Sequence, residues 1–194
     1  MGRKNTAILL FDDVEVLDFA GPFEVFSVTN ELNDYAILNV YTVAREKVPV
    51  LARNGLSVNP DFAMAKAPTP DFLIVPGGYG TRQVMNQQDV INWIKESADN
   101  AEKVMSVCTG ALLLAKAGLL EGLRATTHHQ VFELLARLAP NTEIVQDERF
   151  VDNGKIITSG GISTGIDMSL YVIGLVYGED AAQKTATYIE YRRI

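Results

Sequence analysis

Short, continuously apolar segments alternate along this chain with longer segments in which apolar residues recur every three to four positions. A short apolar run bounded by turn residues is typical of a strand buried on both faces, as strands are in parallel sheets. Strands are expected at 6–11, 35–44, 71–75, 104–107, 124–127, 143–146, 149–152 and 156–159. Because parallel strands are joined by helices that cover the sheet, the pattern predicts an α/β fold with helices on both faces of a mainly parallel sheet.

The helical segments carry boundary signals of their own. Pro22 suits a first helical turn, so the first helix is expected to begin near Gly21. Asn54–Gly55 and Asn153–Gly154 are hairpin-turn signals, and the first joins short strands that look like an insertion at a sheet edge. Further helices are expected at 90–101, 111–117, 131–138, 166–177 and 182–189, and the two short strands at 49–52 and 56–58.

Composition narrows the class of protein. With 194 residues, of which 47% are hydrophobic, the chain is expected to form one domain over 1–194. Twenty-four acidic and 17 basic residues give a net charge of −7, which argues against a nucleic-acid partner. Without a signal peptide or a stretch of about 20 apolar residues, we expect a soluble cytoplasmic protein with no membrane partner. One cysteine excludes an intrachain disulfide, and two adjacent histidines leave no complete zinc site of common spacing.

The one cysteine lies where an expected strand meets an expected helix. The strand over 104–107 and the helix over 111–117 place the turn at Cys108 and Thr109. Backbone N–H groups at a helix N-terminus have no intrahelical partner, and together with the helix dipole they favour an anion. The position therefore predicts a lowered pKa for the Cys108 thiol and ready oxidation by peroxide.

The residues around Cys108 also resemble the nucleophile elbow of α/β hydrolases, with Ser106 and Gly110 as its small flanks. An elbow predicts a strained backbone conformation at Cys108. The alternative is that Cys108 is a buried small hydrophobic residue, the commonest fate of a free cysteine. The local sequence leaves both interpretations open.

Other polar and glycine residues follow the expected strands, so parallel pairing would bring them to one edge of the sheet. The backbone amides of Gly77 and Gly78 are suited to holding negative charge, and Asp18 to giving a proton to a substrate. Each has a structural alternative: a glycine turn, and a helix N-cap at Asp18. His128 is weighed as a buried, hydrogen-bonded side chain against a functional one. His129 is expected on a solvated helix face. Thr109 and Asp167 are possible helix caps, and Gly160–Gly161 is expected to form a second glycine turn after a strand.

Taken together, these motifs resemble the ThiJ/PfpI superfamily, which shares a flavodoxin-like three-layer fold with class I glutamine amidotransferase domains. Within it they are similar to two branches: isocyanide hydratases, and the amidase-like ligand domains of AraC-type transcription regulators. The motifs are Val16 to Phe26 (VLDFAGPFEVF), Ile74 to Gly78 (IVPGG), Ser106 to Gly110 (SVCTG), Ala117 to Gly122 (AGLLEG), Ala125 to His128 (ATTH) and Gly160 to Asp167 (GGISTGID).

The resemblance implies that Cys108 is the reactive residue and that Asp18 partners its thiol. Cys108 would attack an isocyanide carbon while Asp18 delivers a proton, and water would release an N-substituted formamide from the resulting thioimidate. Peptidase-like members carry a histidine directly after the cysteine, whereas Thr109 stands here, which argues against a protease. The expected catalytic residues are thus Cys108, Asp18 and Thr109, and those binding the substrate or an oxyanion are Gly77, Gly78, Thr109 and His128.

The same resemblance implies a small electrophilic substrate, a homodimer, and no metal or organic cofactor. Its alternative function is a small-molecule-sensing or redox-responsive domain related to AraC-type regulators, without turnover. Such regulators continue into a basic DNA-binding segment, which this sequence lacks before it ends at Ile194. The expectation is therefore a free-standing isocyanide hydratase-like lyase.

Overall fold

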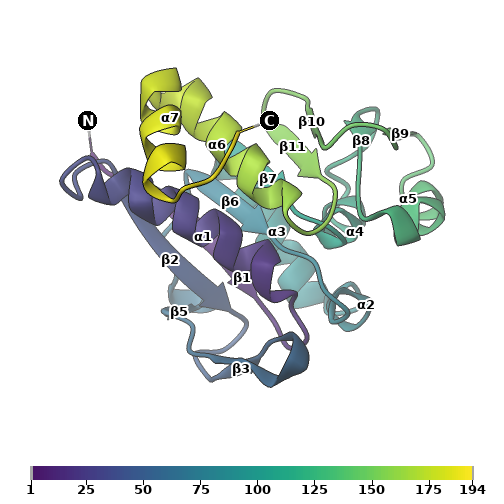
Figure 1. Cartoon of the computed structure of the whole chain (residues 1–194). Helices are drawn as coiled ribbons and strands as arrows, with labels where there is room; N and C mark the ends of the chain where they lie inside the picture. The colour runs from purple at the N-terminus through teal and green to yellow at the C-terminus, as the bar shows by residue number, and fades with distance from the viewer. Residues whose placement is uncertain (1, 194) are drawn as a thin grey trace.

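A seven-stranded sheet forms the middle layer of the computed structural model, which describes residues 2–193 (Figure 1). Its strand order is β10-β11-β7-β6-β1-β2-β5, and every neighbouring pair is parallel except β10 with β11. The strands are β1 (Lys4–Leu10), β2 (Leu38–Ala44), β5 (Phe62–Ala63), β6 (Phe72–Val75), β7 (Lys103–Ser106), β10 (Phe150–Asp152) and β11 (Ile156–Ser159). Two separate pairs are β3 (Val50–Leu51) with β4 (Ser57–Val58), antiparallel, and β8 (Arg124–Ala125) with β9 (Glu143–Ile144), parallel.

Helices cover both faces of this sheet. In Figure 1, α1, α6 and α7 lie in front of it, and α3 and α4 lie behind. The α-helices are α1 (Val16–Glu31), α2 (Thr81–Val84), α3 (Gln88–Asn100), α4 (Gly110–Lys116), α5 (Phe132–Leu138), α6 (Thr164–Tyr177) and α7 (Glu179–Tyr188), with 3₁₀ turns at Arg53–Gly55, Met64–Lys66 and His129–Val131. The predicted three-layer α/β fold with a mainly parallel sheet is confirmed. No helix among residues 2–193 is long and apolar enough to cross a membrane.

The central strands carry the core. Every residue of β6 is buried, and so are all but the first residue or two of β1 and β7, as expected for strands covered on both faces. Because these strands are parallel, β1, β6, β7 and β11 all end at the same edge of the sheet. The segments that follow them, which hold Gly77, Cys108 and Gly160, are therefore brought together there.

The predicted start of the first helix is wrong. α1 begins at Val16 rather than near Gly21, and Pro22 lies inside it. Its start is fixed by tertiary contacts: Val14 forms a β-bridge with Gly78, and the Glu15 N–H donates to the Gly77 carbonyl (2.9 Å). The N-cap position is thus Glu15, and the capping interpretation of Asp18 is also wrong.

The capping interpretation of Asp167 fails in the same way. Asp167 lies in the first turn of α6, after an N-cap at Ser163. Its carboxylate accepts hydrogen bonds from the Arg149 guanidinium and from the Tyr191 hydroxyl (2.9 Å). Asp167 therefore connects α6 to the segment just before β10 and to the C-terminal segment.

Candidate active site

Cys108 occupies a tight turn between β7 and α4. Its φ is +57°, a left-handed conformation that non-glycine residues rarely adopt and that costs free energy. The Cys108 N–H points to the carbonyls of Ser159 (3.2 Å) and Gly160 (2.8 Å), and the Thr127 hydroxyl donates to the Cys108 carbonyl (2.7 Å). These contacts hold the strained turn, so the predicted strain at Cys108 is confirmed.

The loop after β11 closes over the thiol. A Cβ at Gly161 would overlap the His128 ring and lie 3.1 Å from the Cys108 sulfur. Only glycine therefore lets this loop approach so closely. The sequence marked Gly160–Gly161 as a turn but did not assign Gly161 to the site.

Asp18 lies beside the thiol with no contact to solvent. Its Oδ2 accepts the Gly77 N–H (3.1 Å), and Oδ1 is buried without a hydrogen-bond partner among the described residues. Burial raises the pKa of Asp18 to about 7; the Gly77 N–H opposes this rise, and the charge of Glu15 adds to it. Near neutral pH this carboxyl therefore holds a proton in a large share of the molecules.

The predicted lowering of the Cys108 pKa is wrong. Burial and the neighbouring Asp18 charge raise the pKa of the thiol, and the Thr109 N–H at the start of α4 only partly opposes this. The short helix contributes one hydrogen bond, whereas desolvation acts on the whole side chain, which is 6% exposed. The two groups influence each other's titration, and the Cys108 thiol keeps its proton near neutral pH, so the oxidation expected from a lowered pKa loses its basis.

Gly77 and Gly78 have other roles than the predicted one. The Gly77 N–H is bonded to Asp18, and the Gly78 N–H donates to the Thr109 hydroxyl (2.9 Å), so neither is free to hold an oxyanion. A Cβ at Gly77 would lie 2.5 Å from the Thr109 nitrogen, which explains the glycine. Thr109 Oγ1 also donates to the Gly78 carbonyl (3.1 Å) and does not cap α4, which corrects the capping alternative.

His128 is half-buried and shares a cavity with Cys108. Its Nδ1 accepts the Gln130 N–H (3.3 Å), which leaves the proton of the neutral ring on Nε2. Burial lowers the pKa of His128, and the charges of His129 and Arg82 lower it further. His128 is thus a neutral donor at pH 7. His129 is exposed, as predicted.

The cavity over Cys108 measures about 160 Å³ and is open to solvent. At ~30 Å³ per water molecule this is room for a small molecule. Asp18 lies behind the cavity wall rather than on it. The lining residues are Glu15, Arg53, Gly78, Tyr79, Arg82, Cys108, Thr109, His128, Gln130, Val131 and Ile162.

Several of these lining residues were not predicted. Tyr79 directly follows the predicted Gly77–Gly78 turn and Arg82 comes three residues later, so their position after a strand end was an available signal. Arg53 comes from the 3₁₀ turn between β3 and β4, and nothing local in the sequence connects it to the site.

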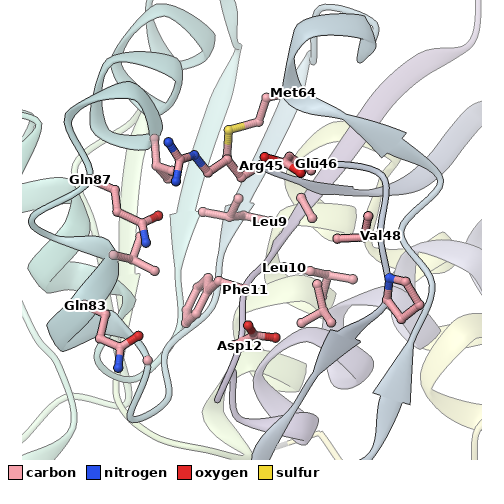
Figure 2. A pocket seen from close by; sticks show the side chains of 16 residues that line it. Leu9, Leu10, Phe11, Asp12, Arg45, Glu46, Val48, Met64, Gln83 and Gln87 are labelled. Atoms are coloured by element: carbon pink, nitrogen blue, oxygen red, sulfur yellow. The ribbon is translucent and has the colours of Figure 1, made fainter.

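A larger cavity of about 230 Å³ lies elsewhere, at the ends of β1 and β2 (Figure 2). Leu9 and Phe11 line its apolar part, and Asp12, Gln83 and Gln87 its polar part. It contains no nucleophile, so the chemistry at Cys108, rather than cavity size, identifies the candidate site. Among residues 2–193, no group of three or more His, Cys, Asp or Glu side chains is arranged to hold a metal ion.

The sequence pattern of the DJ-1/PfpI family matches residues 4–174, most of the chain. The chain belongs to the DJ-1/PfpI family. Among its relatives is the isonitrile (isocyanide) hydratase of Pseudomonas putida, 37% identical over 183 residues, which are 94% of this chain and 76% of that enzyme.

The chain is also similar to a transcriptional regulator and to proteins with solved structures. The transcriptional regulator GbdR of Pseudomonas aeruginosa is 26% identical over 98% of this chain, which spans about half (52%) of that regulator. A ThiJ/PfpI family protein from Pseudomonas syringae has a TM-score of 0.89 at 27% identity, covering 100% of this chain and 77% of that one. Drosophila melanogaster DJ-1beta has a TM-score of 0.86 at 20% identity, covering 98% and 99% of the two chains, and shows the fold alone.

Proposed function

We propose that this protein is an isocyanide hydratase that works through a covalent bond to Cys108. The observation that carries the proposal is the buried Asp18 carboxyl, which holds a proton near neutral pH directly beside the only thiol of the chain. A proton donor and a nucleophile at one carbon are what hydration of an isocyanide requires. The 37% identity to an isonitrile hydratase supports the same reaction.

In the first step, the isocyanide carbon moves past the cavity lining to within reach of Asp18, and the Asp18 carboxyl gives its proton to that carbon. The Cys108 sulfur forms a bond to that carbon, and the thiol proton passes to the Asp18 carboxylate. The product is a thioimidate, R–N=CH–S–Cys108, and the Asp18 carboxyl is restored. The Gly77 N–H stabilises the carboxylate while it exists, because it already donates to Oδ2.

In the second step, a water molecule adds to the thioimidate carbon. One water proton goes to the substrate nitrogen and the other returns to sulfur as the carbon–sulfur bond breaks, which releases R–NH–CHO and the Cys108 thiol. Asp18 relays these protons, and His128 donates from Nε2 to the substrate. Thr109 holds the Gly78 backbone in place through its two hydrogen bonds.

A ligand-sensing domain is the second candidate, because regulators of the GbdR type are similar over almost the whole chain. The two candidates differ in turnover: a sensor binds a small molecule and leaves it unchanged. A redox-sensing role is the weaker form of this candidate, since burial and the Asp18 charge disfavour the reactive thiolate. We also propose a cytoplasmic homodimer that acts without cofactor.

The test is incubation of the purified protein with p-tolyl isocyanide and with cyclohexyl isocyanide, followed by detection of the formamides. We expect catalytic formation of formamide, and its loss in Cys108→Ala with the fold retained. Formamide formation at the wild-type rate in Cys108→Ala, or none with the wild-type protein, would contradict the proposal.

A further inference from the structure

The mouth of the cavity over Cys108 carries two arginines against one aromatic ring. The guanidinium carbon of Arg82 lies 5.1 Å from the centre of the Tyr79 ring, and that of Arg53 lies 5.6 Å from it. Tyr79 is 63% exposed, so its ring holds both cations at the boundary with solvent. Arg53 comes from the β3–β4 connection and Arg82 from α2, so two distant segments bring positive charge to one place.

Only one of these cations has a carboxylate within ion-pair distance among residues 2–193. Arg53 lies 3.7 Å from Asp13, whereas Arg82 has no ion pair among residues 2–193 and donates to the Gly78 carbonyl (3.3 Å). Glu15 lines the same cavity but pairs with neither arginine. The Arg82 guanidinium, which has no ion-pair partner among residues 2–193 and lines the mouth of the cavity, favours a bound anion.

We propose that the substrate carries a carboxylate, which Arg53 and Arg82 bind while its reactive carbon lies at the Cys108 sulfur. Guanidinium groups match carboxylates with paired N–H···O bonds. The identity of the reactive end rests on the proposed function, so the substrate class is a small isocyano carboxylic acid. Its charged group stays at the solvent boundary, where desolvation costs least.

Alkylation of Cys108 tests the anion site without any hydratase turnover. Iodoacetate and iodoacetamide both alkylate sulfur through their CH₂ carbon with loss of iodide. The CH₂ carbon carries a carboxylate in iodoacetate and a neutral amide in iodoacetamide. Because Cys108 is the only cysteine, the protein mass reports one site. The ratio of the two rates, divided by the same ratio for N-acetylcysteine at the same pH, gives the preference due to the protein.

We expect this normalised ratio to favour iodoacetate at least about tenfold, the size expected for hydrogen bonds to a charged group. The double variant Arg53→Gln/Arg82→Gln brings the normalised ratio to about one, because it removes the preference for the charged reagent. Arg137→Gln is the matched control, since Arg137 is an exposed arginine on α5 that faces Glu133 and lies outside the cavity lining. It should leave both rates unchanged.

Turnover then separates this proposal from the proposed function. The double variant should raise KM for 4-isocyanobutanoate at least about tenfold relative to any change in KM for its methyl ester. If the wild-type protein hydrates neither compound yet still prefers iodoacetate, the hydratase proposal fails and the carboxylate site stands. A wild-type normalised ratio of one, or an equal loss for both alkylating reagents in the double variant, overturns the carboxylate site.

Discussion

Asp18 and Asp167 lie in the first turns of two apolar helices, α1 and α6, and neither caps its helix. Asp167 accepts hydrogen bonds from Arg149 and Tyr191, so its carboxylate has a cationic partner. Asp18 has no cationic partner among residues 2–193, is fully buried, and has a pKa raised to about 7 by desolvation. Both carboxylates lie in the first turn of their helices, so the position does not explain the difference. A cationic partner makes one carboxylate a structural link, whereas the buried carboxylate without such a partner can carry a proton.

Asp18→Asn is the strongest test of the difference between the two aspartates. The amide keeps the shape of the side chain and removes the transferable proton. General acid–base groups contribute about 10²- to 10⁴-fold, so kcat for isocyanide hydration should fall at least about a hundredfold. Steady-state formamide formation measures this. An Asp18→Asn protein with wild-type kcat would return Asp18 to a structural role.

The same variant has an effect on stability whose sign follows from the pKa. The folded pKa of about 7 lies above the unfolded value of 3.8, so the wild-type protein loses stability as the pH rises from about 4 to 7. Asparagine does not titrate. The melting temperature of Asp18→Asn minus that of wild type should therefore be more positive at pH 8 than at pH 5. Melting temperatures at both pH values give the result. An equal difference at the two pH values would show that the pKa of Asp18 is not raised.

Gly161→Ala tests the site through the loop after β11 and leaves both aspartates unchanged. The added Cβ would overlap the His128 ring and lie 3.1 Å from the Cys108 sulfur, so one of them has to shift. A misplaced reacting group typically costs about tenfold to a hundredfold in rate, and we expect a loss in kcat/KM of at least about tenfold. Gly160→Ala is the matched control, because its Cβ would meet nothing closer than 3.7 Å. Equal kcat/KM values for the two variants would contradict this account of the loop.

Glu15→Gln should move the pH profile without abolishing activity. The Glu15 charge raises the pKa of Asp18, so its removal lowers that pKa. Because the first step needs the protonated carboxyl, kcat/KM should fall at alkaline pH, and this fall should begin at a lower pH in the variant. Glu24→Gln, at an exposed position of α1, should leave the profile in place. A shift toward higher pH would contradict the mechanism.

Asp167→Asn should have the smallest effect. The Arg149 side chain of this ion pair is 43% exposed, and partly exposed ion pairs contribute about 0–1 kcal/mol to stability. We expect a loss of at most about 1 kcal/mol in the free energy of unfolding and a kcat within about twofold of wild type. Urea unfolding and formamide assays measure both. A hundredfold loss of activity would mean that Asp167 also serves the reaction.

The sequence could predict what local patterns determine. The apolar runs located the central strands, and the small residues around Cys108 predicted its strained turn, because both depend on neighbours within a few positions. The two-residue edge strand β5 was missed, since so short a segment has no periodicity.

The properties of the site depend on groups that come from other parts of the chain. The sequence predicted a lowered pKa at Cys108 from the helix alone, whereas burial and Asp18, ninety positions away, set its direction. The N–H groups of Gly77 and Gly78 were expected to be free because their partners, Asp18 and Thr109, lie in other segments. Desolvation and long-range hydrogen bonds leave no local pattern in a sequence.

The central claim is that Asp18 holds a proton near neutral pH beside the Cys108 thiol. Infrared spectroscopy tests it directly, because a protonated carboxyl has a carbonyl stretching band that the carboxylate lacks. The difference between wild type and Asp18→Asn should show this band at pH 6, and the band should disappear as the pH rises through about 7. A difference spectrum without the band at pH 6, with Asp18 already ionised there, would contradict the account.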